Sequence, residues 1–175
     1  NMDKFELGIA VQKVYDFIWD EFCDWYVEMA KFRIYHKEEA PEAANCALWV
    51  LKTVLAQGLK LLHPFMPFIT EEIWQHLPHE GESIMISEWP EYDEKLNFPK
   101  DVESMELIMQ SISAIRNRRA EMNVPPSKKA KVIIVTDKTD VFKQGTAFFE
   151  KLASASEAVV QTDKSGISDN AVNVV

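Results

Sequence analysis

Apolar side chains recur at helical spacing along the first 35 residues. The stripe advances three or four residues at a time and comprises Leu7, Val11, Val14, Ile18, Phe22, Trp25 and Met29. Because an α-helix turns once every 3.6 residues, these positions share one face. The spacing predicts one long helix over residues 3–35. Additional aromatic residues widen the stripe, so we expect other elements to contact this helix on more than one side.

Proline residues mark the limits of the next helix. Pro41 suits a first helical turn, where its missing N–H group has no helical partner. His63 precedes Pro64, and a proline disfavours helical geometry in the residue before it. The pattern therefore predicts a second helix over residues 41–62. Two apolar stripes on this helix predict that it packs on two sides.

Two further helices are predicted before residue 124. Thr70 is a plausible N-cap for the third, with Glu71 and Glu72 favourably placed in its first turn. That helix is expected to end near Leu77. A long loop over residues 78–99 follows, and the fourth helix is predicted to end before the Val-Pro-Pro sequence that begins at residue 124.

The hydrophobic period changes from helical to extended after Lys131. Residues 132–135 predict a short buried strand, and residues 139–153 predict a helix. Residues 159–160 and 171–175 predict two more short strands. We therefore expect a mainly α fold, with a helical bundle at residues 1–127 and a small mixed α/β appendage at residues 128–175.

A basic segment joins these two predicted parts. It holds six basic residues and one acid, Glu121, for a net charge of +5 in a chain of formal charge −9, which leaves −14 elsewhere. The basic residues are Arg116, Arg118, Arg119, Lys128, Lys129 and Lys131. A concentrated basic patch on an acidic protein favours a polyanionic partner. A solvated face beside a helix C-terminus and a strand explains the charge about equally well.

Two details sharpen the choice of binding residues. Arg119 falls on the apolar stripe of the fourth helix, so its side chain must extend to solvent, pair with a buried acid, or reach a ligand. A second basic group, with Lys31, Arg33 and Lys37, ends the first helix. There, too, stabilisation by the helix dipole and ligand binding are competing explanations.

The sequence contains no pattern typical of catalysis or cofactor binding. It has neither a G-x-x-x-x-G-K-[ST] loop nor a G-x-G-x-x-G motif. His76 and His79 are three residues apart, but no second ligand pair completes a metal site. We therefore predict no catalytic residue, no metal and no cofactor. Cys23 and Cys46 are expected to be buried free thiols of a cytoplasmic protein, and no apolar run is long enough for a membrane span.

Three motifs resemble one family of nucleic-acid-binding proteins. Residues 62–74 read Leu-His-Pro-Phe-Met-Pro-Phe-Ile-Thr-Glu-Glu-Ile-Trp, similar to the hallmark of the helical anticodon-binding domain of class I aminoacyl-tRNA synthetases with aliphatic substrates. Residues 15–26 and 115–126 resemble the valyl members of that family. The motifs lie within residues 1–135, whereas the tail after residue 135 matches the family only loosely.

The resemblance implies a helical bundle that binds the anticodon stem-loop of valine tRNA. It also implies a catalytic domain using ATP and Mg²⁺ upstream of Asn1, and a further arm after residue 175, so the chain is expected to be a fragment that catalyses nothing. The candidate tRNA-binding residues are Arg116, Asn117, Arg118, Arg119, Lys128 and Lys129, with Lys31, Arg33 and Lys37 as a second group. Basic residues would position phosphates, while unstacked bases would be read by stacking and hydrogen bonds.

Two other functions remain open at this point. The bundle could be a structural brace that docks the catalytic domain through an aromatic face, in which case tryptophans of the first helix should be exposed. It could also be a protein-interaction bundle whose basic segment contacts an acidic partner. Salt concentration separates the first alternative from RNA binding, because an RNA site weakens steeply with salt and an apolar face does not.

Overall fold

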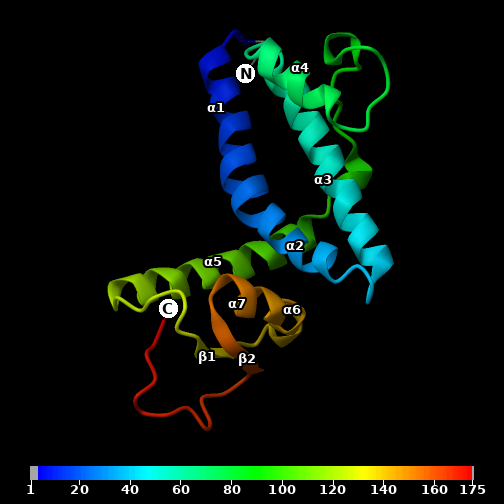
Figure 1. Ribbon diagram of the computed structural model, residues 1–175. Helices are drawn as coiled ribbons and strands as arrows, with labels where there is room; N and C mark the ends of the chain where they lie inside the picture. The colour runs from blue at the N-terminus through cyan, green and yellow to red at the C-terminus, as the bar shows by residue number, and fades with distance from the viewer. Residues whose placement is uncertain (1–3, 175) are drawn as a thin grey trace. The chain divides into compact units, whose positions relative to one another are not determined.

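The computed structural model describes residues 4–174 and divides into two compact units, Asn1–Tyr92 and Asp93–Val175. Figure 1 shows the elements of each unit. The boundary predicted from the sequence, between residues 127 and 128, concerns the family domain and stays a prediction. The two compact units instead meet in sequence after Tyr92, so the fourth predicted helix belongs to the second unit.

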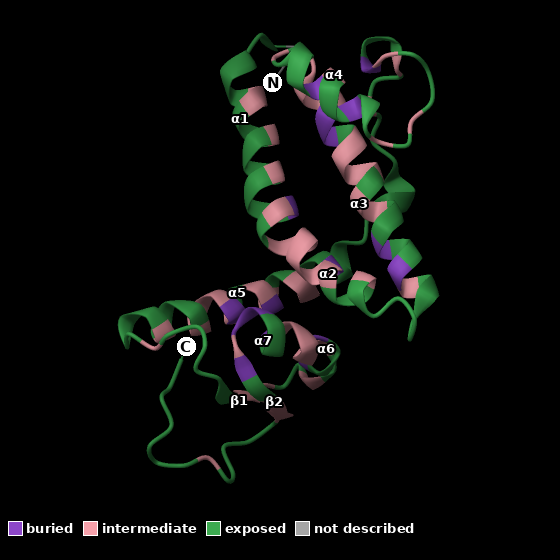
Figure 2. Cartoon of the chain, in the orientation of Figure 1, coloured by how far each residue is buried: buried purple, intermediate pink, exposed green. Residues whose placement is uncertain are grey.

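The first helix has a π-helical middle. It comprises α1 (Leu7–Asp16), the π-helical η2 (Phe17–Val27) and α2 (Glu28–Tyr35), with helical dihedral angles at both junctions. The predicted long helix is confirmed from Leu7 onward, whereas residue 3 lies outside the described part. A π-helix bonds residues five apart, so the side-chain period shifts within η2. Of the predicted stripe only Phe22 is fully buried, and Figure 2 shows α1 largely exposed.

Prolines begin the next two helices. The helix α3 (Pro41–Leu62) starts at Pro41 and ends before His63, as predicted. The helix α4 (Pro67–Gln75) begins at Pro67, so the predicted N-cap at Thr70 is wrong. The reason is local: proline suits the first turn, and Thr70 then lies one turn inside the helix, where its hydroxyl donates to the Met66 carbonyl (2.8 Å).

The core of the first unit lies between α3, α4 and the following loop. Leu59, Trp74 and Ile84 form its buried cluster, and Ile84 comes from the short 3₁₀ helix η3 (Ile84–Ile86). Gly58 allows a close approach of η2 to α3, because a Cβ there would lie 3.3 Å from Ile18 Cδ1. The helix α3 contacts α2 and α4, and the two-sided packing predicted for it stays a prediction.

The second unit stacks helices on a two-stranded sheet. Its elements are η4 (Glu94–Leu96), α5 (Pro99–Glu121), β1 (Ala130–Val135), α6 (Thr139–Gln144), α7 (Thr146–Leu152) and β2 (Ala155–Gln161). The strands are parallel, with Ile133 paired to Val159, and α6 and α7 form the crossover that parallel strands require. Figure 1 shows these two helices between α5 and the sheet.

Two predictions for this unit need correction. The helix predicted over residues 139–153 is interrupted at Gly145, where the backbone meets α5 so closely that a Cβ would lie 2.6 Å from Ile108 Cδ1. The strand predicted over residues 171–175 is not formed at residues 171–174, and residue 175 lies outside the described part. The overall prediction of a mainly α fold with a small α/β part is confirmed.

Candidate functional site

The basic segment begins at Arg116, near the end of α5, and passes through a tight loop into β1. Asn123 adopts a left-handed conformation (φ 53°), which asparagine tolerates better than most residues. The Val124 N–H then donates to the Arg119 carbonyl at 2.9 Å. Next, the Lys128 N–H donates to the Pro125 carbonyl at 3.0 Å, which closes a turn over residues 125–128. We call residues 125–128 the 125–128 turn.

Arg119 binds the backbone of the 125–128 turn. Its Nη2 donates to the Pro125 carbonyl at 3.1 Å and to the Lys128 carbonyl as well. The sequence left three fates for a half-buried arginine in this register. The structure shows a fourth possibility, because Nη2 of the guanidinium bonds main-chain oxygens of the following loop.

Arg116 bonds the C-terminal end of α7. Its Nε donates to the Leu152 carbonyl at 2.7 Å, in the last turn of α7. Helix C-terminal carbonyls lack helical partners and carry partial negative charge, so an arginine there is stabilising. Arg116 therefore holds α5 to α7 within this unit.

The remaining cations of the segment differ in their partners. Arg118 forms an exposed ion pair with Glu121 (2.9 Å), and Lys131 pairs with Glu157 across the two strands (2.9 Å). Exposed pairs of this kind contribute about 0–1 kcal/mol, so either cation could exchange its partner for another anion at little cost. Asn117, on the same helix, is exposed.

Lys128 and Lys129 are exposed at the end of the 125–128 turn. Among residues 4–174, neither ammonium group has a hydrogen-bond or ion-pair partner. The structure therefore places two unpaired positive charges side by side in sequence, on a loop whose backbone is held by Arg119. Of the first predicted group, these two residues are the most available to an anionic ligand.

The second predicted group lies in the first unit and is described separately. Lys31 is bonded to Glu28, a contact that raises the pKa of the Lys31 ammonium. Arg33 and Lys37 are exposed. Arg33 also acts on Tyr26: burial raises the pKa of that phenol, and the charge of Arg33 opposes the rise.

The His-Pro motif has a structural role in the first unit. His63 Nδ1 lies 2.8 Å from Thr70 Oγ1, and Thr70 is almost fully buried. Since the Thr70 hydroxyl already gives its hydrogen to the Met66 carbonyl, His63 Nδ1 must be the donor in the second contact. The motif thus fixes the connection between α3 and α4.

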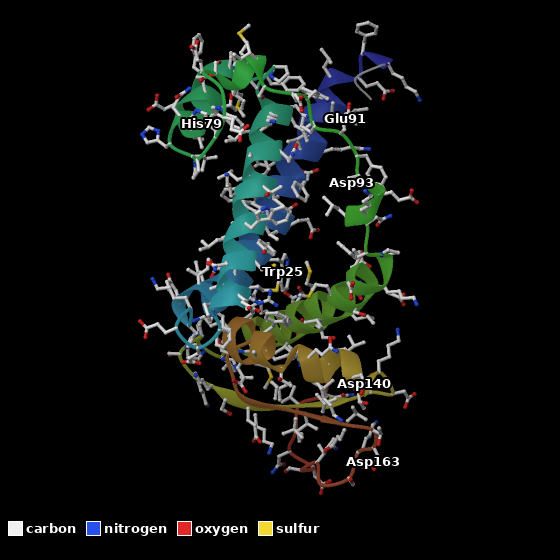
Figure 3. All side chains as sticks on the ribbon, turned by 90° about the vertical axis from the view of Figure 1, so that its right-hand side faces the viewer. Trp25, His79, Glu91, Asp93, Asp140 and Asp163 are labelled. Carbon is white, nitrogen blue, oxygen red and sulfur yellow. The ribbon has the colours of Figure 1, made fainter. Side chains whose placement is uncertain are left out.

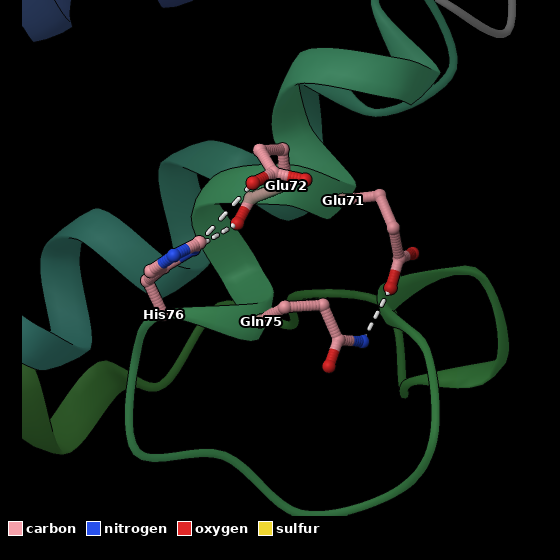
Figure 4. Close-up of polar contacts among 4 residues, drawn as sticks. All are labelled: Glu71, Glu72, Gln75 and His76. Atoms are coloured by element: carbon pink, nitrogen blue, oxygen red, sulfur yellow. Dashed lines mark hydrogen bonds and ion pairs between the residues drawn. The ribbon is translucent and has the colours of Figure 1, made fainter.

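Glu71 anchors the loop that follows α4. Its carboxylate accepts hydrogen bonds from Gln75, Ser83 and the Ile84 N–H, and these bonds, the Gln75 one foremost, hold its pKa below the ordinary value. Glu72 points to His76 instead, at 3.9 Å (Figure 4). The two carboxylates diverge, as the sequence predicted, so they do not form an acid–base pair.

The predicted absence of a metal or catalytic centre remains a prediction. Over residues 4–174, no group of three or more His, Cys, Asp or Glu side chains is arranged to hold a metal ion. His79, labelled in Figure 3, bonds the Leu77 carbonyl, and its ring makes a tilted contact with that of Trp74. Both cysteines are free, but Cys46 is exposed and Cys23 is only half-buried, so the prediction that they are buried is wrong. No helix in the described part is both long and apolar enough to cross a membrane.

Comparison with known proteins assigns the chain to a family. The family model described as "Anticodon-binding domain of tRNA ligase" matches residues 1–134. The valine–tRNA ligase of Clostridium perfringens is 54% identical over the whole chain, and that of Clostridium acetobutylicum is 52% identical. The chain covers 20% of each relative's length. The Bacillus cereus enzyme is 46% identical over 93% of the chain. The predicted resemblance is thus confirmed, and the chain belongs to the family of anticodon-binding domains of tRNA ligases.

Proposed function

We propose that this chain binds the anticodon stem-loop of valine tRNA as the anticodon-binding part of a cytoplasmic valine–tRNA ligase. The family match and the names of the relatives support this proposal. In the complete ligase, a catalytic domain outside this chain would use ATP and Mg²⁺ to join valine to the tRNA. The chain would contribute by holding the RNA, so that the acceptor end reaches that domain.

The observation that carries the proposal is the exposed charge of Lys128 and Lys129, which has no ion-pair partner among residues 4–174. RNA binding begins with neutralisation of phosphates, which sets register and orientation without reading sequence. The remainder of the chain is strongly acidic and would repel RNA. Phosphate binding therefore depends on a local basic site, and the 125–128 turn with Lys129 supplies one in the second unit.

Arg118 is a further contact in the proposed complex. Within residues 4–174 its guanidinium is paired with the exposed Glu121 alone, and a phosphate could replace that weak partner. Arg33 and Lys37 would serve in the same way from the first unit. Arg116 and Arg119, in contrast, already bond main-chain carbonyls, so their contribution to phosphate binding would be indirect.

The experiment that tests this function is a binding titration of the chain with a valine-tRNA anticodon stem-loop. An otherwise identical stem-loop with a different anticodon is the control, and each titration is done at two salt concentrations. We expect binding that prefers the valine anticodon and weakens steeply as salt rises. Equal affinity for the two loops would reject anticodon reading, and failure to bind at low salt would reject RNA binding altogether.

A structural brace is the second candidate, and exposed apolar surface on the first unit favours it. Trp19 on η2 and Trp49 on α3 are each 56% exposed. A groove of about 560 Å³ with an almost entirely apolar lining opens in the same unit. It is lined by Phe22, Val27, Leu48, Trp49, Leu51, Lys52, Leu55, Leu77 and Pro78.

The proposed occupant of this groove is the catalytic part of the same ligase, because the relatives are about five times longer than the chain. Exposed apolar patches of this kind commonly mark sites of contact with another protein part. In the complete ligase, Trp49→Lys should weaken attachment of the two parts without altering the salt dependence of RNA binding. If the Trp49→Lys ligase resists proteolysis between the two parts as well as the wild type does, the brace is rejected.

A further inference from the structure

We propose that Arg119 is a positioning residue for RNA binding: it holds the 125–128 turn so that Lys128 and Lys129 meet phosphates, and it does not contact the RNA itself. This inference rests on the proposed function. It separates two roles that the sequence could not distinguish, because arginine and lysine in one basic segment carry the same charge.

The hydrogen bonds around the turn carry the argument. The Arg119 carbonyl accepts from Val124 on one side of the loop, and the Arg119 Nη2 donates to Pro125 and Lys128 on the other. One residue therefore connects the end of α5 to both ends of the turn. The Lys128 N–H bond to the Pro125 carbonyl completes the closure.

The chemistry of the arginine side chain suits this task. A guanidinium is planar and has donors fixed in direction, so it can bond two carbonyls together, whereas an ammonium is a point charge with freely rotating donors. The two prolines that follow Val124 restrict the same backbone further. The lysines thus begin from an ordered backbone, and binding has less conformational entropy to remove.

Direct contact between Arg119 and a phosphate is the competing explanation. The two explanations make different predictions about coupling between residues. If Arg119 acts through the lysines, its substitution should have no effect once the lysines are gone. If Arg119 binds phosphate itself, the two losses should add.

The experiment is a double-mutant cycle on RNA affinity, measured with the whole chain and the valine-tRNA anticodon stem-loop at two salt concentrations. The variants are Arg119→Lys, Lys128→Ala/Lys129→Ala, and the combination of all three. Arg119→Lys keeps the charge and most of the side chain but loses the planar fork. Arg118→Ala is the matched control, because that exposed arginine is adjacent in sequence and has no bond to the turn.

We expect Lys128→Ala/Lys129→Ala to weaken binding and to reduce the slope of log affinity against log salt by roughly 1.5. Arg119→Lys should weaken binding roughly two- to tenfold, although the charge is unchanged, because the lysines must then be ordered on binding. In the lysine-free background, the same Arg119→Lys change should have no effect. Arg118→Ala should weaken binding by the same factor in both backgrounds.

The outcomes separate this inference from the function on which it rests. Equal losses from Arg119→Lys in both backgrounds would overturn the positioning role and leave RNA binding intact. Wild-type affinity for the Arg119→Lys variant would overturn it too. If the wild-type chain does not bind RNA, or if Lys128→Ala/Lys129→Ala binds as well as wild type, the proposed site fails and the positioning role with it.

A second variant covers the case in which Arg119→Lys impairs folding. Pro125→Gly keeps every charge, the Arg119 side chain and the carbonyl that accepts its bond, but it loosens the turn backbone. We expect a loss of affinity that again disappears in the lysine-free background. Full wild-type affinity for Pro125→Gly would overturn the view that order in this turn matters for binding.

Discussion

The His-Pro motif in the first unit and the basic segment in the second differ in how their polar side chains are used. In the motif, His63, Thr70 and Glu71 all bond to the protein itself. In the segment, the arginines bond inward or to a neighbouring acid, while the ammonium groups of Lys128 and Lys129 have no partner in the described part of the chain. Internal partners, rather than charge density, therefore distinguish residues that build the fold from residues available to a ligand.

Removing the motif's largest buried side chain tests the structural half of this comparison and should have the largest effect. Trp74 is 5% exposed, so Trp74→Ala should lower the free energy of unfolding of the first unit by about 3–5 kcal/mol. Chemical denaturation, followed by circular dichroism, measures this free energy of unfolding. Trp74→Phe is the control and should cost less, because it keeps a ring and removes an Nε1–H that has no hydrogen-bond partner among residues 4–174. Wild-type stability of Trp74→Ala would mean that this core is misassigned.

Packing within the second unit can be tested at Gly145, between α6 and α7. A Cβ at this position would lie 2.6 Å from Ile108 Cδ1, and Ile108 is itself buried. Gly145→Ala should therefore destabilise the second unit by about 1–3 kcal/mol. In contrast, Gly8→Ala in α1 meets no atom within 4 Å and should stabilise the first unit by about 1 kcal/mol. Thermal melts measure the stability of both variants. Equal shifts in melting temperature for the two variants would contradict the close approach of Gly145 to Ile108.

A smaller effect, dependent on pH, is expected at Glu71. Hydrogen bonds lower its pKa in the folded state, so the carboxylate stabilises the fold above the unfolded-state pKa, near 4.5, and this contribution is lost as pH falls through the folded value. Acid-induced melting of the first unit should therefore depend less on pH in Glu71→Gln. The matched control is Glu72→Gln, which leaves the loop bonds intact. An unchanged pH profile for Glu71→Gln would show that those bonds do not favour the ionised form.

Much of the fold follows from short-range sequence rules. Helical spacing and the prolines at positions 41 and 64 predicted the first two helices, and extended spacing predicted β1 and β2. The π-helical η2 was not predicted, because apolar spacing was interpreted with the ordinary helical period. The break at Gly145 depends on contact with Ile108, which lies far away in sequence.

The candidate site was located from sequence but not resolved into roles. Clustering of charge identified residues 116–131 without any structural information. The availability of each cation to a ligand depends on its partners within the protein. The partner of Arg116, the Leu152 carbonyl, is 36 residues away in sequence. The bonds from Arg119 to the turn are shorter in range, yet only the left-handed Asn123 and the closure at Lys128 bring those carbonyls within reach.

The most direct test of the comparison is a map of backbone amide NMR shifts as the valine-tRNA anticodon stem-loop is added to the chain. We expect the largest changes at residues 127–130, and little change around Leu59, Trp74 and Ile84 in the core of the first unit. The changes at residues 127–130 should diminish as salt is raised. Shifts in the first unit alone, with residues 127–130 unaffected at low salt, would contradict the assignment of the unpaired lysines to RNA binding.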